Sequence, residues 1–207
     1  MTIAEITEWI SAAKEVIIGL SAVFATVFAY VGINTWRKEL KGKAEYQLAK
    51  DVLKSVYKVR DAFKHVRHPA IFAYEYPEEM RDYSGHLKRE KDYEGTLYVY
   101  EKRWQKMDEA FRELEEHHLD AQVEWGSEFQ NVIVKLRSCR AELLVTIQQM
   151  LDEKKNPQRI MRDKESMEKA FSILYDNGGN SEFDKFTPQI EAAVKEFEVW
   201  LRPHIKK

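Results

Sequence analysis

The stretch VIIGLSAVFATVFAYVGINTW occupies residues 16–36 and carries no charged side chain, although Asp, Glu, Lys and Arg make up 33% of the 207-residue chain. As a helix, a segment of this length rises about 31 Å, close to the thickness of the hydrocarbon core of a bilayer. The stretch is apolar on all sides, whereas a helix of a soluble bundle usually keeps one polar face. It therefore predicts a transmembrane helix over 16–36.

The charges on either side of this stretch differ in sign. Residues 1–15 carry Glu5, Glu8 and Glu15 against Lys14, so they lack the basic region of a cleavable signal peptide. After the stretch, basic residues outnumber acidic ones as far as residue 60. The apolar stretch is therefore interpreted as an uncleaved anchor, and the positive-inside rule predicts residues 1–15 outside and residues 37–207 in the cytoplasm.

Two kinds of residue mark the expected membrane interface. Tyr30 and Trp36 lie toward the C-terminal boundary of the stretch, where amphipathic rings favour the headgroup zone. The basic residues that follow can contact anionic headgroups, at about 1 kcal/mol each; they are Arg37, Lys38, Lys41 and Lys43. A merely solvated charged face is the alternative, and it is the better reading from Lys50 onward.

Small residues recur every four positions within the stretch, at Ser21, Ala25 and Ala29. Such spacing lets two membrane helices approach closely. Homo-oligomerisation through this stripe is therefore one outcome that the sequence allows. Alanine and serine are also common in spans that do not associate.

The rest of the chain reads as helical. Gly (8) and Pro (5) are scarce, which disfavours an all-β protein, and the lone Cys139 suits a reducing compartment. Steps of three and four separate the apolar residues of the first stripe, which predicts one helix from the span to about residue 67: Ala49, Val52, Val56, Val59, Phe63 and Val66. Pro69 should stop it.

Four further segments complete the predicted body. Apolar stripes at helical spacing cover 93–118 and 125–150, with residues 117–127 as a short connection between them. Asn156 and Pro157 should open a short helix that includes Ile160 and Met161, and 176–181 should break it. A last helix should run from Thr187 as N-cap to Pro203. The fold class expected is all-α: one N-terminal transmembrane helix continuing into a cytosolic four- to five-helix antiparallel bundle.

Residues 69–92 form the least regular part of the sequence and carry several aromatic side chains among charges. These are Phe72, Tyr74, Tyr76 and Tyr83. One interpretation is a loop whose rings cap an end of the bundle. The other is a segment that docks a partner or acts as a lid, because exposed aromatic side chains anchor interfaces well.

Motifs for chemistry are sparse. The chain has no Gly-rich phosphate loop and no paired-cysteine zinc pattern, so no cofactor is expected. Glu115 and His118 form one Glu-x-x-His, whereas a di-iron bundle needs two, so no metal is expected either. The 176–181 segment lacks the alternating acids of a calcium loop and reads as a plain turn.

Three Arg-x4-His pairs resemble the motif of small helical-bundle RNases of the HEPN class: Arg60 with His65, Arg81 with His86, and Arg112 with His117. In such a pair the arginine would stabilise phosphate charge and the histidine would move a proton. A membrane-tethered RNase is thus the alternative function. Three matches in different places weaken any single choice.

The segment GINTWRKELKGKAEYQLAKDVLKSVYKVRDAFKHVRHPAI, residues 32–71, resembles a pattern in uncharacterised bacterial single-span proteins. There an apolar span precedes a Trp, a basic Lys-Gly segment, a Tyr-x-Leu-Ala helix and an Arg-Asp pair before a proline. The resemblance covers about a fifth of the chain and implies a bacterial inner-membrane location. It implies no activity and no site residues.

Together these observations favour a non-enzymatic, single-pass protein of the bacterial inner membrane, with its N-terminus out. Its cytosolic bundle would recruit, regulate or scaffold an unknown protein partner at the membrane. The net charge of −2 gives no reason to expect a nucleic-acid partner. A soluble bundle that hides the apolar stretch within an oligomer is a third hypothesis.

Overall fold

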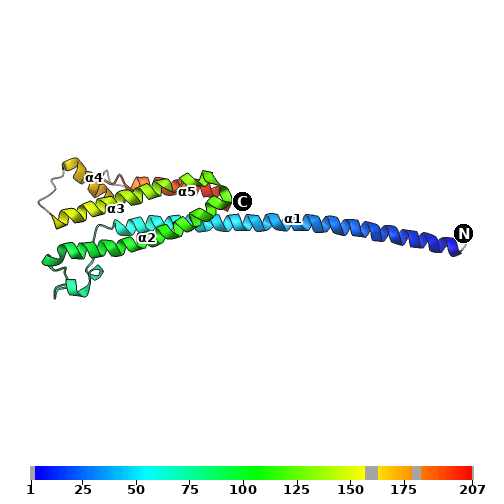
Figure 1. Ribbon diagram of the computed structural model, residues 1–207, viewed down its shortest axis with the longest axis horizontal. Helices are drawn as coiled ribbons and strands as arrows, with labels where there is room; N and C mark the ends of the chain where they lie inside the picture. The colour runs from blue at the N-terminus through cyan, green and yellow to red at the C-terminus, as the bar shows by residue number, and fades with distance from the viewer. Residues whose placement is uncertain (1–2, 157–162, 179–182, 207) are drawn as a thin grey trace. The chain divides into compact units, whose positions relative to one another are not determined.

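A computed structural model describes residues 3–156, 163–178 and 183–206, and these residues are all-α (Figure 1). The described chain contains five α-helices and no β-strand. The helices are α1 (Ile3–Val66), α2 (Asp92–Trp125), α3 (Val134–Lys155), α4 (Lys164–Leu174) and α5 (Thr187–Ile205). The all-α class expected from the helical spacing of the apolar stripes is confirmed.

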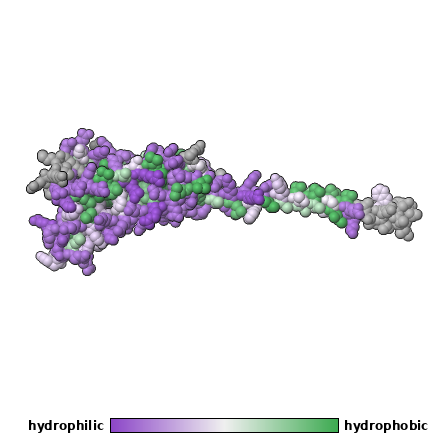
Figure 2. Space-filling model, in the orientation of Figure 1, coloured by the Kyte–Doolittle hydropathy of each residue, from purple (hydrophilic) through white to green (hydrophobic). Residues whose placement is uncertain are grey.

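The chain divides into two compact units, Met1–Tyr46 and Gln47–Lys207. In the first unit, α1 is the one helix of the described chain that is long and apolar enough to cross a membrane. No side chain of its most apolar 18-residue window is buried. Figure 2 shows this hydrophobic surface in green along the same part of α1.

The second unit has a continuous hydrophobic core. The stripe predicted from Ala49 to Val66 is fully buried, and Phe63 makes edge-to-face contacts with Phe111 of α2 and Phe186. Such ring pairs stabilise a core beyond their buried area. The helix ends at Val66, just before the His68–Pro69 pair, as expected from the bias of the residue before proline.

Helices α2 and α3 form an antiparallel hairpin. Three ion pairs join residues whose numbers rise on one helix as they fall on the other: Asp92 with Lys154, Asp108 with Arg140, and Glu115 with Arg137. Helix α3 also contacts α4 and α5. Cys139 is buried in α3, and burial raises the pKa of its thiol, in keeping with an inert core position.

The predicted connection at 117–127 is wrong, because α2 continues as far as Trp125. His118 and Ala121 extend the buried stripe through that segment, and the His118 ring contacts the Phe129 carbonyl oxygen at 3.2 Å. The break comes at Gly126, whose φ of 77° lies in the region that only glycine adopts freely. Burial of the His118 face therefore overrides the polar residues around it.

The boundaries of α4 and α5 also differ from expectation. Asn156 caps the end of α3, and Asp163 caps α4 by accepting a hydrogen bond from the Ser166 N–H. Pro157, Ile160 and Met161 lie outside the described residues. Thr187 is the first residue of α5, not its N-cap.

Pro203 does not end α5, which continues to Ile205. A proline lacks an N–H, so it removes one helical hydrogen bond. So close to the C-terminus the cost is confined to one turn, and the Lys206 N–H still donates to the Arg202 carbonyl at 3.1 Å.

Candidate functional site

The predicted span presents apolar side chains on every side. Its large hydrophobic residues from Val16 to Trp36 are between 50% and 73% exposed. The Ser21 and Thr26 hydroxyls donate to the carbonyl oxygens four residues earlier, at 2.8 and 2.9 Å. These polar groups are therefore satisfied within the helix, which is what a hydrocarbon surrounding requires.

The other residues predicted to act at the membrane also lie exposed on α1. The side chains predicted to lie at the membrane interface are all exposed: Tyr30, Trp36, Arg37, Lys38, Lys41 and Lys43. Ser21, Ala25 and Ala29 share one exposed face of the helix. Lys41 lies 3.9 Å from Glu45, one helical turn away. The sequence-predicted interface residues are thus all accessible to solvent or lipid.

The segment between α1 and α2 is ordered by short turns and by one tight reversal. Residues 73–75, 78–80 and 89–91 form single 3-10 turns. In the reversal, the Asp82 carboxylate accepts the Ser84 and His86 N–H groups, and Gly85 adopts a φ of 82°. Leu87 then packs on Gly95 of α2 so closely that a Cβ there would lie 2.6 Å from a Leu87 methyl.

Arg103 of α2 fastens this segment. Its guanidinium donates to both Glu75 carboxylate oxygens at 2.7 and 2.8 Å, and to the His68 and Ala70 carbonyls at 2.8 and 2.7 Å. Arg103 is only 3% exposed. Burial alone would raise the pKa of Glu75, but hydrogen bonds from Arg103 and from the Phe72 N–H outweigh it and lower that pKa.

The aromatic residues of the segment divide into two groups. The Phe72 and Tyr74 rings stack on each other with centroids 5.5 Å apart, and both are exposed. Tyr83, at the tip of the tight reversal, is fully exposed, and Tyr76 is half-buried. None of the four rings belongs to the hydrophobic core cluster, and Tyr76 differs from the other three only in being half-buried.

A cavity of about 470 Å³ lies beside the Arg103–Glu75 pair. It is lined by His65, His68, Phe72, Tyr74, Glu75, Tyr98, Val99, Lys102, Arg103 and Lys106. Burial lowers the pKa of His65, and the nearby Lys106 and Arg103 charges lower it further. Two larger hollows, of about 660 and 580 Å³, adjoin α3 and α4; their linings mix acidic and basic side chains.

The Arg-x4-His pairs are not assembled into joint sites. Residues five apart on a helix project about 140° from each other, which separates Arg60 from His65 on α1 and Arg112 from His117 on α2. Arg60 binds its neighbour Asp61 at 2.9 Å and does not line the cavity that His65 lines.

The third pair lies on the tight reversal. Arg81 is 3.9 Å from Glu78, and its backbone pairs with Leu87 rather than with His86. The Arg81 side chain is half-buried, whereas His86 is exposed.

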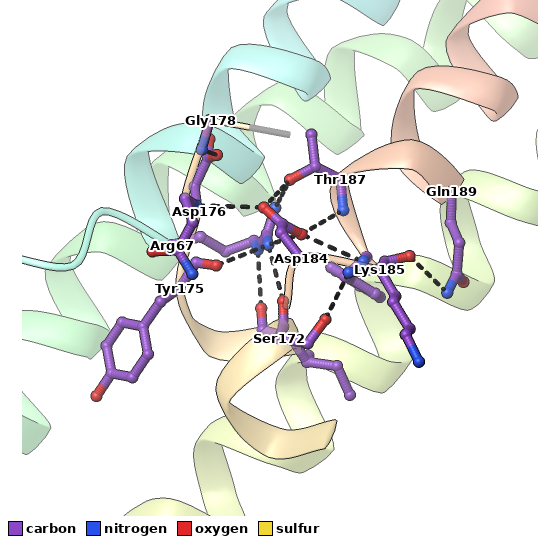
Figure 3. A network of polar contacts seen from close by, with 12 residues as sticks. Arg67, Ser172, Tyr175, Asp176, Gly178, Asp184, Lys185, Thr187 and Gln189 are labelled. Carbon is purple, nitrogen blue, oxygen red and sulfur yellow. Dashed lines mark hydrogen bonds and ion pairs between the residues drawn. The ribbon is translucent and has the colours of Figure 1, made fainter. Parts of the chain in front are cut away.

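A buried polar network surrounds Arg67, a residue to which no sequence motif pointed (Figure 3). Arg67 is 1% exposed and lies 3.1 Å from the buried Asp184 carboxylate. Its nitrogens donate to five acceptors: the Ser172, Ile173 and Tyr175 carbonyls, the Thr187 hydroxyl and Asp184. All three guanidinium nitrogens are engaged, so the network joins the end of α1 to α4 and α5.

Asp184 also performs the capping role predicted for Thr187. Its carboxylate accepts the Thr187 N–H at 2.9 Å and the Thr187 hydroxyl at 2.7 Å. Burial would raise the pKa of Asp184, but the Thr187 hydrogen bonds and the Arg67 charge lower it. Asp184 therefore stays ionised at neutral pH.

Within the described residues, no group of three or more His, Cys, Asp or Glu side chains could hold a metal ion. Glu115, half of the single Glu-x-x-His, is paired with Arg137. The sequence matches no family model, and no curated protein or solved structure is significantly similar to it.

Proposed function

We propose that this protein is a single-pass membrane protein whose C-terminal body, an antiparallel helical bundle, holds a partner protein at the cytoplasmic face. One observation carries the proposal. The α1 helix keeps about 21 consecutive uncharged residues exposed on all sides, with its Ser21 and Thr26 hydroxyls bonded internally. Exposure of such an apolar surface to water costs free energy, whereas the hydrocarbon core of a bilayer would stabilise it.

The orientation rests on charge. The exposed Arg37, Lys38, Lys41 and Lys43 follow the apolar run, and acidic residues dominate before it. This bias favours a cytoplasmic body and an external N-terminus. The resemblance of residues 32–71 to bacterial single-span proteins supports an inner-membrane location. The Ser21–Ala25–Ala29 face offers a route to self-association within that membrane.

The partner-binding role rests on the segment between α1 and α2. Arg103 and Glu75 hold its first part rigid, and the tight reversal presents Tyr83 fully to solvent. An exposed ring on an ordered turn loses little entropy when it is buried by a partner. This suits Tyr83 to anchor an interface.

Affinity purification of the full chain from membranes in mild detergent tests this role. We expect a partner that is lost in Tyr83→Ala and kept in Tyr46→Ala, a matched exposed tyrosine of α1. Failure to recover any saturable partner would contradict recruitment. A partner recovered equally with both variants would remove Tyr83 from the interface.

A tethered RNase is less well supported, because the Arg and His of each helical pair lie on different faces. The observation in its favour is that His65 lines a cavity together with Lys102 and Lys106. An RNA-cleavage assay of His65→Ala, His86→Ala and His117→Ala is decisive. Unchanged activity in all three would end the hypothesis.

A further inference from the structure

The cavity beside Arg103 is built from three parts of the body. His65 comes from the last turn of α1, His68 to Glu75 from the following segment, and Tyr98 to Lys106 from α2. Its volume of about 470 Å³ lies within the usual range of small-molecule sites, about 300–1,000 Å³. It is therefore large enough for a ligand of nucleotide size.

Aromatic rings form a row along one side of this cavity. The His68 and Phe72 centroids are 5.4 Å apart, and the Phe72 and Tyr74 rings are nearly parallel, at 5°. Phe72 and Tyr74 remain 45% and 76% exposed, so ring surface is available to a further planar group. Stacking on such surface tolerates any flat aromatic ligand.

The charges around the cavity are mostly positive. Three cationic side chains, Lys102, Arg103 and Lys106, line it against a single acid, Glu75. Both Glu75 oxygens already accept hydrogen bonds from Arg103, and one also accepts from the Phe72 N–H. Glu75 is thus neutralised by its own partners.

The two lysines differ from Arg103 in how many of their hydrogen-bond donors are already engaged. The Arg103 guanidinium donates hydrogen bonds to the Glu75 carboxylate and to two backbone carbonyls. Lys102 has only a 3.4 Å contact with Gln105 and lies 5.7 Å from the Tyr98 ring centre, and neither lysine forms an ion pair within the described chain. The lysine ammonium groups are therefore free to bind an anion.

From this juxtaposition of stacked rings and lysines around one cavity, we propose that the site binds a nucleoside phosphate. The base stacks on Phe72 or Tyr74, and the phosphate binds Lys102 and Lys106. Arg103 and Glu75 act as positioning residues that hold the rings in place before binding, which limits the entropy lost. The same chemistry is offered by a free nucleotide and by the phosphorylated end of an RNA.

Titration of the full chain in detergent tests the proposal, with AMP, GMP, CMP and UMP as probes. At least one should bind saturably and lose affinity as salt rises. Adenosine or the matching nucleoside lacks the phosphate, and ribose 5-phosphate lacks the base. Each should bind about tenfold more weakly or worse, because each keeps only one of the two contacts.

Paired variants locate the binding. Tyr74→Ala and Lys106→Gln should each weaken it about tenfold, and the matched exposed residues in Tyr83→Ala and Lys54→Gln should leave it unchanged. Tyr83→Ala also separates this site from the proposed partner surface, since it should abolish only partner recovery.

Three results would overturn the proposal: no saturable binding of any monophosphate, equal binding of ribose 5-phosphate, or binding unaffected by both Tyr74→Ala and Lys106→Gln. A 5′-phosphorylated RNA hexamer distinguishes the two sources. Tighter binding than the monophosphate would assign the site to an RNA end, and equal or weaker binding to the free nucleotide. Binding of the hexamer alone would contradict the proposal.

Discussion

The two halves of α1 use apolar residues in opposite ways. From Val16 to Trp36 they lie on every side of the helix and all are exposed, whereas from Ala49 to Val66 they form one stripe that is fully buried. The backbone is helical throughout. The pattern of apolar side chains around the helix therefore determines whether each half is stabilised by lipid or by protein.

The largest contrast should come from one substitution made in both halves. Phe63→Ala removes a ring that packs against Phe111 and Phe186, and should lower the free energy of unfolding of the body by about 3–5 kcal/mol. Phe28→Ala should leave it unchanged, because Phe28 is 73% exposed. Urea unfolding in detergent, followed by tryptophan fluorescence, measures both, and equal effects would erase the distinction between the halves.

A comparable loss is expected where the buried half of α1 ends. Asp184→Ala leaves the Arg67 guanidinium buried without its counter-ion, which should cost about 3–5 kcal/mol in the same unfolding experiment. Asp61→Ala is the control, because its ion pair with Arg60 is exposed and such pairs contribute little. Similar midpoints for the two variants would mean that the Arg67 network does not stabilise the fold.

The exposed half should respond to charge rather than to volume. Val27→Asp places a carboxylate near the centre of the apolar run and should make insertion about 3 kcal/mol less favourable. We expect a smaller fraction of the chain in the membrane pellet, with the unfolding of the body unaltered. Lys54→Asp, outside the run, should stay in the pellet; a soluble Lys54→Asp would mean that the apolar run is not what anchors the chain.

A smaller, pH-dependent effect should come from the body alone. Burial lowers the pKa of His118 below its ordinary value of 6.5. The unfolded chain then binds the extra proton, so this contribution to stability is present above pH 6.5 and lost as the pH falls below it. One histidine can contribute a slope of at most about 1.4 kcal/mol per pH unit.

Unfolding measured between pH 7.5 and 5.5 checks this sign. His118→Gln should flatten the decline in stability toward acid, because it removes the buried group whose protonation opposes folding. Stability that rises as the pH falls would contradict the direction given for His118.

Sequence periodicity predicted the features of the fold that depend on residues close together in the chain. The apolar run, the buried stripe of α1 and its end before Pro69 follow from local patterns. The end of α2 did not, because the tertiary contact between His118 and the Phe129 carbonyl extends the helix beyond its polar residues. The C-terminal end of α2 therefore depends on the burial of the His118 face of the helix, which the spacing of apolar residues does not predict.

The two buried arginines were missed for a related reason. Arg67 and Asp184 are 117 residues apart, and Arg103 binds a carboxylate in an irregular segment. A usable signal was present, since Arg103 falls between Tyr100 and Met107 and Arg67 four residues after Phe63, all buried positions. A charge in a core position predicts a buried partner, but its identity depends on the fold.

Alkaline carbonate extraction of membranes that contain the full chain tests the central claim most directly. We expect the protein to stay in the membrane pellet after both carbonate and high salt, and to leave it only with detergent. Release of the chain by carbonate or salt alone would show that residues 16–36 do not span the bilayer.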